Sequence, residues 1–252
     1  MDRTTHHTRN VAGLVAQRQA LLAFLADLSP EAWDREVPGA GGATVKDVVA
    51  HLAERYAEAL SGTLPPGDQG ASDADVPSPA GRGAGDDPAG LLVELDQYAT
   101  ELESHFAERA GERWSLPAVA FGKLGGTSGM GVAGLLLDLH RHIHQISQAV
   151  GARVPVPEES RDATAAALAW LVGDKVEAPV QVVLEDGADY VIGSGPSVGV
   201  LRTDHDALVA VATGMARPED MAAEGRWSFT GPRDGREAFE HALATTFGDP
   251  EL

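Results

Sequence analysis

The sequence predicts an α+β protein of two domains, a four-helix bundle followed by a small α+β domain with a mostly antiparallel sheet. Up to about residue 150, apolar residues recur at the three- and four-residue spacing of amphipathic helices. After residue 155, short alternating apolar runs typical of strands are mixed with helical segments. The length of 252 residues also suits one to two domains of ordinary size. We therefore place the domains at residues 1–155 and 156–252.

The first domain is expected to hold four helices, which predicts a bundle. The first helix ends before Ser29-Pro30, because the residue that precedes a proline disfavours helical geometry. The second begins at Thr44, which forms a capping-box pattern with Asp47. Residues 64–87 are rich in Gly, Pro, Ala, Ser and Asp and are expected to form a mobile loop. The expected bounds are Val11 to before Ser29, Thr44 to beyond Tyr56, Pro88 to about Glu108, and a segment after Gly131 that ends near Val150.

The second domain is expected to mix short helices with strands. Asp186-Gly187 lies between two alternating runs, which is a hairpin signal. The predicted helices are Asp162–Val172, Asp206–Thr213 and Asp234–Thr246, and the predicted strands are Val180–Glu185, Tyr190–Ile192, Val198–Arg202 and Trp227–Thr230.

Composition excludes several classes of function. The chain has 19 basic and 38 acidic residues, a net charge of −19, so we expect neither nucleic acid nor a membrane surface as a partner. It has no cysteine, which excludes disulfides, cysteine-ligated metals and a cysteine nucleophile. No apolar run approaches the roughly 20 residues of a membrane span, and the N-terminus lacks the apolar core of a signal peptide. We therefore expect a cytoplasmic protein.

The fourth helix carries a cluster of ionisable residues. At about 100° per residue, Asp138 and His142 fall at the edge of the stripe formed by Leu139, Ile143 and Ile146 and face the bundle. His140 and His144 point away, toward solvent or the second domain. An inward carboxylate is costly unless it is paired or binds a cation. The pair is therefore either a hydrogen-bonded Asp–His contact in the core or half of a metal site.

His51 adds a third donor. It lies at the edge of the apolar stripe of the second helix and can also reach the bundle interior. His51, Asp138 and His142 would give the three protein ligands of a catalytic zinc site with one open position. The same donors also suit Fe(II), Ni(II) or Co(II).

Two segments resemble the signatures of a known family. TVKDVVAHLA at residues 44–53 is similar to the pattern W-[ST]-V-x-D-[LV]-[LV]-x-H-L, and DLHRHIHQISQAVG at residues 138–151 is similar to [DE]-x-x-x-H-x-W-D-[LIV]-x-x-A-x-G. Both patterns are typical of the mycothiol-dependent maleylpyruvate isomerase family, a branch of the DinB-like bundles. Leu28-Ser29 and Trp33 match the family's L-S-x-x-x-W, and the segment from Pro179 onward resembles its smaller second domain.

The resemblance implies a divalent metal, normally Zn²⁺, on His51, Asp138 and His142, with mycothiol as the thiol cosubstrate. It implies a cis–trans isomerase or a thiol S-transferase that acts on a small electrophile. Three positions depart from the pattern: Ala43 replaces the family's Trp, and His144-Gln145 replaces its Trp-Asp. The family's substrate arginine is also displaced, and Arg217 is our candidate for binding an anionic substrate.

Two alternatives to an enzyme remain open. The chain could be a non-catalytic protein that keeps the fold and binds or senses a small molecule, which the departures from the pattern favour. The Asp–His pair could also be a structural contact without metal. As an oligomer we expect a monomer or a homodimer.

Overall fold

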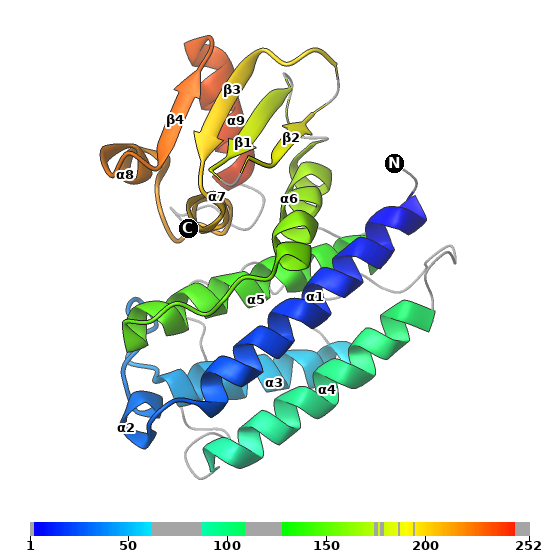
Figure 1. Cartoon of the computed structure of the whole chain (residues 1–252), viewed down its shortest axis with the longest axis vertical. Helices are drawn as coiled ribbons and strands as arrows, with labels where there is room; N and C mark the ends of the chain where they lie inside the picture. The colour runs from blue at the N-terminus through cyan, green and yellow to red at the C-terminus, as the bar shows by residue number, and fades with distance from the viewer. Residues whose placement is uncertain are drawn as a thin grey trace.

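A computed structural model describes residues 3–61, 87–108, 128–173, 176, 179–185, 187–193 and 195–244. Figure 1 shows long helices at one end of the molecule and a four-stranded sheet at the other. The elements are α1 (Arg3–Ala26), α2 (Pro30–Trp33), α3 (Val45–Ser61), α4 (Pro88–Glu108), α5 (Ser128–Val150), α6 (Glu158–Gly173), β1 (Val180–Leu184), β2 (Asp189–Ile192), β3 (Gly199–Thr203), α7 (His205–Ala212), α8 (Pro218–Ala223), β4 (Trp227–Thr230) and α9 (Arg233–Ala244).

The predicted bundle is formed by α1, α3, α4 and α5, which bury one continuous apolar core. Thr44 and Asp47 cap α3 reciprocally as expected: the Thr44 N–H donates to Asp47 Oδ2 at 2.8 Å, and the Asp47 N–H donates to Thr44 Oγ1 at 3.3 Å. The loop expected at residues 64–87 lies almost wholly outside the described residues.

The first helix begins earlier than its apolar stripe indicates. α1 starts at Arg3 rather than near Val11, and its first turns are held by contacts with another helix. His7 is buried, and its Nε2 lies 3.0 Å from the carbonyl oxygen of Phe106 on α4. The short helices α2 and α8 were not predicted. Each has a proline in its first turn, where the missing N–H costs nothing.

A buried ion pair joins α1 to α4. The guanidinium of Arg18 donates twice to the carboxylate of Glu103, at 2.8 Å each, and also contacts Asp96. Arg18 and Glu103 are almost fully buried. Burial raises the pKa of Glu103, and the opposing effect of Arg18 does not cancel the increase. Removing one member of such a pair leaves an uncompensated buried charge, so the pair fixes how α1 and α4 meet.

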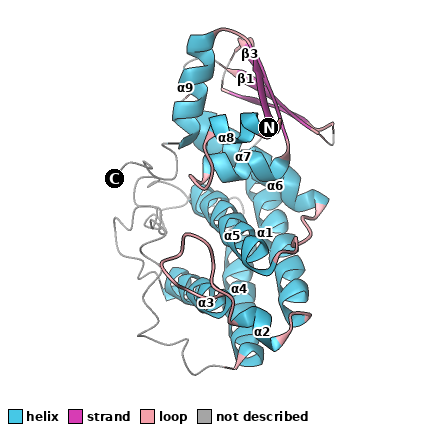
Figure 2. Cartoon of the chain, turned by 90° about the vertical axis from the view of Figure 1, so that its left-hand side faces the viewer, coloured by secondary structure: helices cyan, strands magenta, loops and turns pink. Residues whose placement is uncertain are grey.

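The sheet of the second domain has the strand order β2-β1-β3-β4. The pairings β1–β2 and β3–β4 are antiparallel and β1–β3 is parallel, so the sheet is mixed and mostly antiparallel, as predicted. Figure 2 shows α7 and α9 on the same side of the sheet. Val180, Val182 and Leu184 of β1 belong to the core that forms there with residues of α6, α7 and α9.

α6 connects the two parts of the molecule. It packs along α1 and α5 on the bundle side and against β2 on the other. Ala163 belongs to the bundle core, whereas Leu168 and Leu171 belong to the core beneath the sheet. The boundary between residues 155 and 156 stays a prediction. Within the described residues, no helix is long and apolar enough to cross a membrane.

The close approach of α1 and α6 depends on Gly13. A Cβ atom at this position would overlap Cβ of Ala163, so we expect Gly13→Ala to lower the free energy of unfolding by about 1–3 kcal/mol. Gly90→Ala in α4 is the matched control, because a Cβ there meets nothing within 4 Å. It should be neutral or stabilise by up to ~1 kcal/mol. Urea denaturation of both variants tests this, and an unchanged Gly13→Ala midpoint would contradict the packing.

Candidate functional site

The bundle brings two histidines from separate helices together. The ring centroids of His51 on α3 and His142 on α5 are 5.4 Å apart, with the planes tilted by 44°. His142 is buried, and His51 and Asp138 are partly buried. The helical wheel of α5 therefore identified correctly the residues that face the bundle.

One ring nitrogen of His142 has a defined partner. Its Nδ1 lies 2.8 Å from the backbone carbonyl oxygen of Asp138, which can only accept, so Nδ1 carries the proton. This leaves the lone pair of a neutral ring on Nε2. Metal-binding histidines commonly use this arrangement, with one nitrogen donating to a carbonyl and the other free to coordinate.

The carboxylate of Asp138 lies near the same nitrogen of that ring. Its Oδ1 is 3.6 Å from Nδ1 of His142, too far for a hydrogen bond. The carboxylate therefore adds negative charge near the imidazole pair but does not converge with Nε2 on one point. Among the described residues, no group of three or more His, Cys, Asp or Glu side chains is arranged to hold a metal ion.

The surroundings of His51 favour its neutral ring. Burial, and secondarily the proximity of His142, lowers the pKa of His51 from its ordinary value of 6.5 to about 4, although Asp138 acts in the opposite direction. A neutral imidazole is the form that binds a metal. In donor type and proximity, the imidazoles of His51 and His142 suit a divalent metal, the carboxylate of Asp138 would have to move to join them, and the three-residue ligand set stays a prediction.

Arg217 lies far along the chain on the surface of the second domain. It is the N-cap residue of α8, and its side chain is 68% exposed. Its guanidinium donates to both carboxylate oxygens of Asp220, at 2.9 and 3.0 Å, and lies 3.2 Å from Glu219. The structure thus gives Arg217 local acidic partners and does not bring it to the histidine pair in any described contact.

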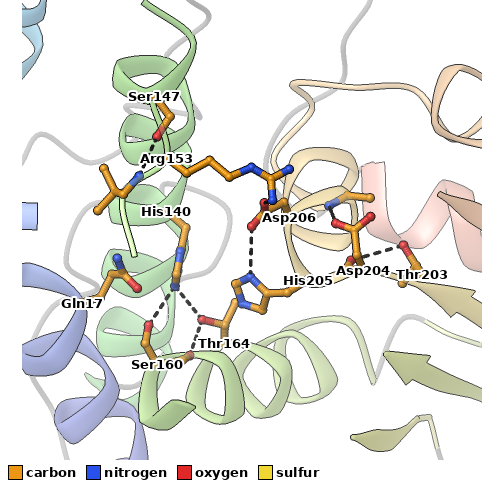
Figure 3. Close-up of polar contacts among 12 residues, drawn as sticks. Gln17, His140, Ser147, Arg153, Ser160, Thr164, Thr203, Asp204, His205 and Asp206 are labelled. Carbon is orange, nitrogen blue, oxygen red and sulfur yellow. Dashed lines mark hydrogen bonds and ion pairs between the residues drawn. The ribbon is translucent and has the colours of Figure 1, made fainter. Parts of the chain in front are cut away.

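The other two histidines of α5 face the second domain. His140 is buried, and its Nε2 lies 3.0 Å from Ser160 Oγ and 2.8 Å from Thr164 Oγ1, both on α6 (Figure 3). Its ring packs edge-on against His205 of α7 at a centroid distance of 5.1 Å. Of the two orientations that the sequence left open for His140, the structure selects the second domain.

His144 lines a cleft between α5 and α7 that sequence reasoning missed. Arg153, His205, Asp206 and Arg226 also line it. These residues come from three segments separated by up to about 80 positions, so no local motif marks them. The local sequence indicates only where α7 begins. Asp204 caps this helix, because its Oδ1 accepts a hydrogen bond from the N–H of Ala207 at 2.9 Å.

The first half of the chain is similar to a known protein family. Residues 14–137 match the family profile of the mycothiol maleylpyruvate isomerase N-terminal domain. The chain carries the N-terminal domain of this family. The match includes His51 and ends one residue before Asp138. No curated protein gives a significant match.

Two solved structures are similar to this chain. A mycothiol-dependent maleylpyruvate isomerase is 14% identical over 86% of this chain and 90% of its own, with a TM-score of 0.50. A mutant of a mycothiol-dependent maleylpyruvate isomerase covers the same shares at 14% identity, with a TM-score of 0.49. At this identity the first structure supports the two-domain α+β fold and nothing finer.

The low pKa of His51 has a measurable consequence. In the metal-free protein, we expect its ring protons to titrate near pH 4 by NMR, with His51→Ala identifying the resonance by its loss. Between pH 6.5 and 4, the unfolded chain binds a proton on His51 that the folded chain does not. The free energy of unfolding should therefore fall as the pH falls through this window, and less steeply in His51→Gln. A titration midpoint near 6.5 would contradict the buried environment.

Proposed function

We propose that this protein is an enzyme that uses a low-molecular-weight thiol, of the mycothiol-dependent maleylpyruvate isomerase type. Its substrate would be a small electrophile, and its reaction a cis–trans isomerisation or an S-transfer. The observation that supports this most directly is the proximity of His51 and His142, whose ring centroids are 5.4 Å apart. His51 lies within the segment that matches the family, and His142 lies five residues after its end.

In this proposal, a divalent metal, most simply Zn²⁺, is held by His51, Asp138 and His142. When bound, such a metal would stabilise the thiolate form of a thiol, which is the nucleophilic form. The chain has no cysteine of its own, so the thiol must come from a cosubstrate such as mycothiol.

The residues of the chain prepare this site in three ways. The carbonyl of Asp138 holds the proton of His142 on Nδ1 and so keeps Nε2 available. Burial keeps the ring of His51 neutral. The carboxylate of Asp138 would contribute a negative charge beside the two imidazoles, which favours a cation over an uncharged ligand.

A non-catalytic binding protein is the second candidate. His144 stands where the family pattern has a tryptophan, and it is directed to the cleft between α5 and α7 instead of to the histidine pair. Its Nε2 lies 2.8 Å from Nε2 of Gln148. The position of the family's aspartate is occupied by Gln145, which cannot supply a carboxylate.

Metal binding tests the ligand set. After removal of metal with a chelator, we expect the protein to bind about one Zn²⁺ per chain, with three ligands from the protein. His51→Ala and His142→Ala should each weaken zinc binding by more than ~10–100-fold. That range is typical of losing a residue that only hydrogen-bonds to a metal ligand. His241→Ala on α9 is the control. Equal zinc content and affinity in all four proteins would contradict the proposed site.

Turnover separates the enzyme from the binding protein. Zinc-loaded protein offered mycothiol with maleylpyruvate, or with a general electrophile, should show thiol-dependent isomerisation or conjugation that His51→Ala reduces to background. The assay follows product by chromatography, with thiol omitted in one arm. Stoichiometric zinc binding without turnover in any arm would overturn the enzyme and support the non-catalytic protein.

A further inference from the structure

A cleft of about 240 Å³ lies between the second half of α5 and α7, separate from the histidine pair. Figure 3 shows His140, Arg153, His205 and Asp206 gathered around it from different segments. His51, Asp138 and His142 are not among its lining residues. Because His140 and His144 are each two positions from His142, they project from the opposite side of α5. The cleft is therefore a second candidate site.

His205 is buried at this cleft without a hydrogen bond. Its ring is 9% exposed, and neither ring nitrogen has a hydrogen-bond partner among the described residues. Its nearest polar contact is from Nδ1 to Oδ1 of Asp206, at 3.7 Å. Nδ1 thus has an ion-pair contact with Asp206 but no hydrogen bond, and Nε2 has no hydrogen bond. A buried polar atom without a hydrogen bond is costly, which favours a ligand that enters the adjoining cleft.

The two arginines of the cleft differ in how firmly they are held. Arg226 donates to both carboxylate oxygens of Asp204 at 2.8 Å, so its charge is already neutralised. Arg153 is 82% exposed, and its described ion-pair contact is to Oδ2 of Asp206 at 3.6 Å. Arg153 can therefore turn its guanidinium to an incoming anion without breaking a strong contact.

Asp206 lies between the two uncommitted donors. One of its carboxylate oxygens faces Arg153 and the other faces His205, and both distances exceed hydrogen-bond length. The carboxylate of Asp206 is thus shared between Arg153 and His205 and is within hydrogen-bond distance of neither. A second carboxylate would give each donor a partner of its own, since a guanidinium binds a carboxylate through two parallel N–H groups.

The remaining walls are apolar. Ile143, Val154, Val156 and Val209 line the same cleft. Its volume of 240 Å³ lies below the range of about 300–1,000 Å³ that is typical of pockets for drug-sized ligands. A ligand that fits this cleft would therefore be small and have an apolar part.

We propose that this cleft binds a small monocarboxylate with an apolar body, its carboxylate held by Arg153 and His205 and its body by the valine and isoleucine side chains. The net charge of the chain is −19, so general attraction would not bring an anion here, and recognition depends on these two donors. This site requires neither metal nor thiol, so it stands or fails separately from the proposed activity.

Benzoate is a suitable probe, because it combines one carboxylate with an apolar ring. NMR titration of the full chain should show saturable binding, with shifts centred on His205 and Val209. Benzamide has the same body without the charge and should bind at least about tenfold more weakly, as expected for losing a charged hydrogen bond. Inorganic phosphate has the charge without the body and should also bind more weakly. Absence of saturable benzoate binding, or equal affinity for benzamide, would overturn the proposal.

Two variants locate the binding. Arg153→Gln and His205→Phe should each weaken benzoate binding by about tenfold. Arg233→Gln is the matched control, because Arg233 is similarly exposed at 84% and pairs with Glu237 on α9. It should leave the affinity unchanged. Circular dichroism melting confirms that each variant is folded, and Arg153 lies on the surface, so its replacement is compatible with folding. If Arg153→Gln binds benzoate as the unaltered chain does, the carboxylate lies elsewhere and the proposal is wrong.

Discussion

The burial of α5 between the bundle and the second domain is the constraint on which both sites depend. Leu139, Ile143 and Ile146 belong to the bundle core, whereas Ala133 and Leu137 belong to the core beneath the sheet. A helix that is buried on opposite sides must place its polar residues at the edges between the apolar stripes, or leave them in the interior. Residues two positions apart on a helix differ in direction by about 200°. His142 therefore points toward one side of α5, and His140 and His144 point toward the other. One helix therefore supplies two groups of ionisable side chains that do not meet.

Several buried polar groups of this molecule are satisfied by other side chains. Arg18 and Glu103 satisfy each other with two hydrogen bonds of 2.8 Å, and His140 is satisfied by Ser160 and Thr164. These groups hold helices together. The ring of His205 is different, because neither of its nitrogens has a hydrogen-bond partner among the described residues. Other buried groups among the described residues, such as the side-chain amide of Asn10 and the hydroxyl of Tyr56, also lack a hydrogen bond, so a missing partner indicates a ligand only where a cleft adjoins the group, as at His205.

The sequence was sufficient where a feature is periodic or local. The stripe of α5 predicted that His142 faces the bundle, and the spacing of Thr44 and Asp47 predicted where α3 begins. It was insufficient where the outcome depends on a distant segment. The start of α1 at Arg3 depends partly on the contact of His7 with α4. The cleft around His205 depends on how α7 docks on α5, and the partner of Arg217 depends on a short helix that has no periodicity.

The carboxylate of Asp138 can move without changing the tautomer of His142. The backbone carbonyl of Asp138, and not its carboxylate, accepts the hydrogen bond from Nδ1 of His142. The ring is therefore held in one tautomer wherever the carboxylate lies. The carboxylate lies 3.6 Å from Nδ1 and gives up no hydrogen bond to the ring if it moves. A ligand whose orientation is fixed through the main chain keeps its geometry when an outer carboxylate is missing. Gln145, which occupies the place of the family's aspartate, therefore leaves the tautomer of His142 unchanged, because the main chain sets that tautomer.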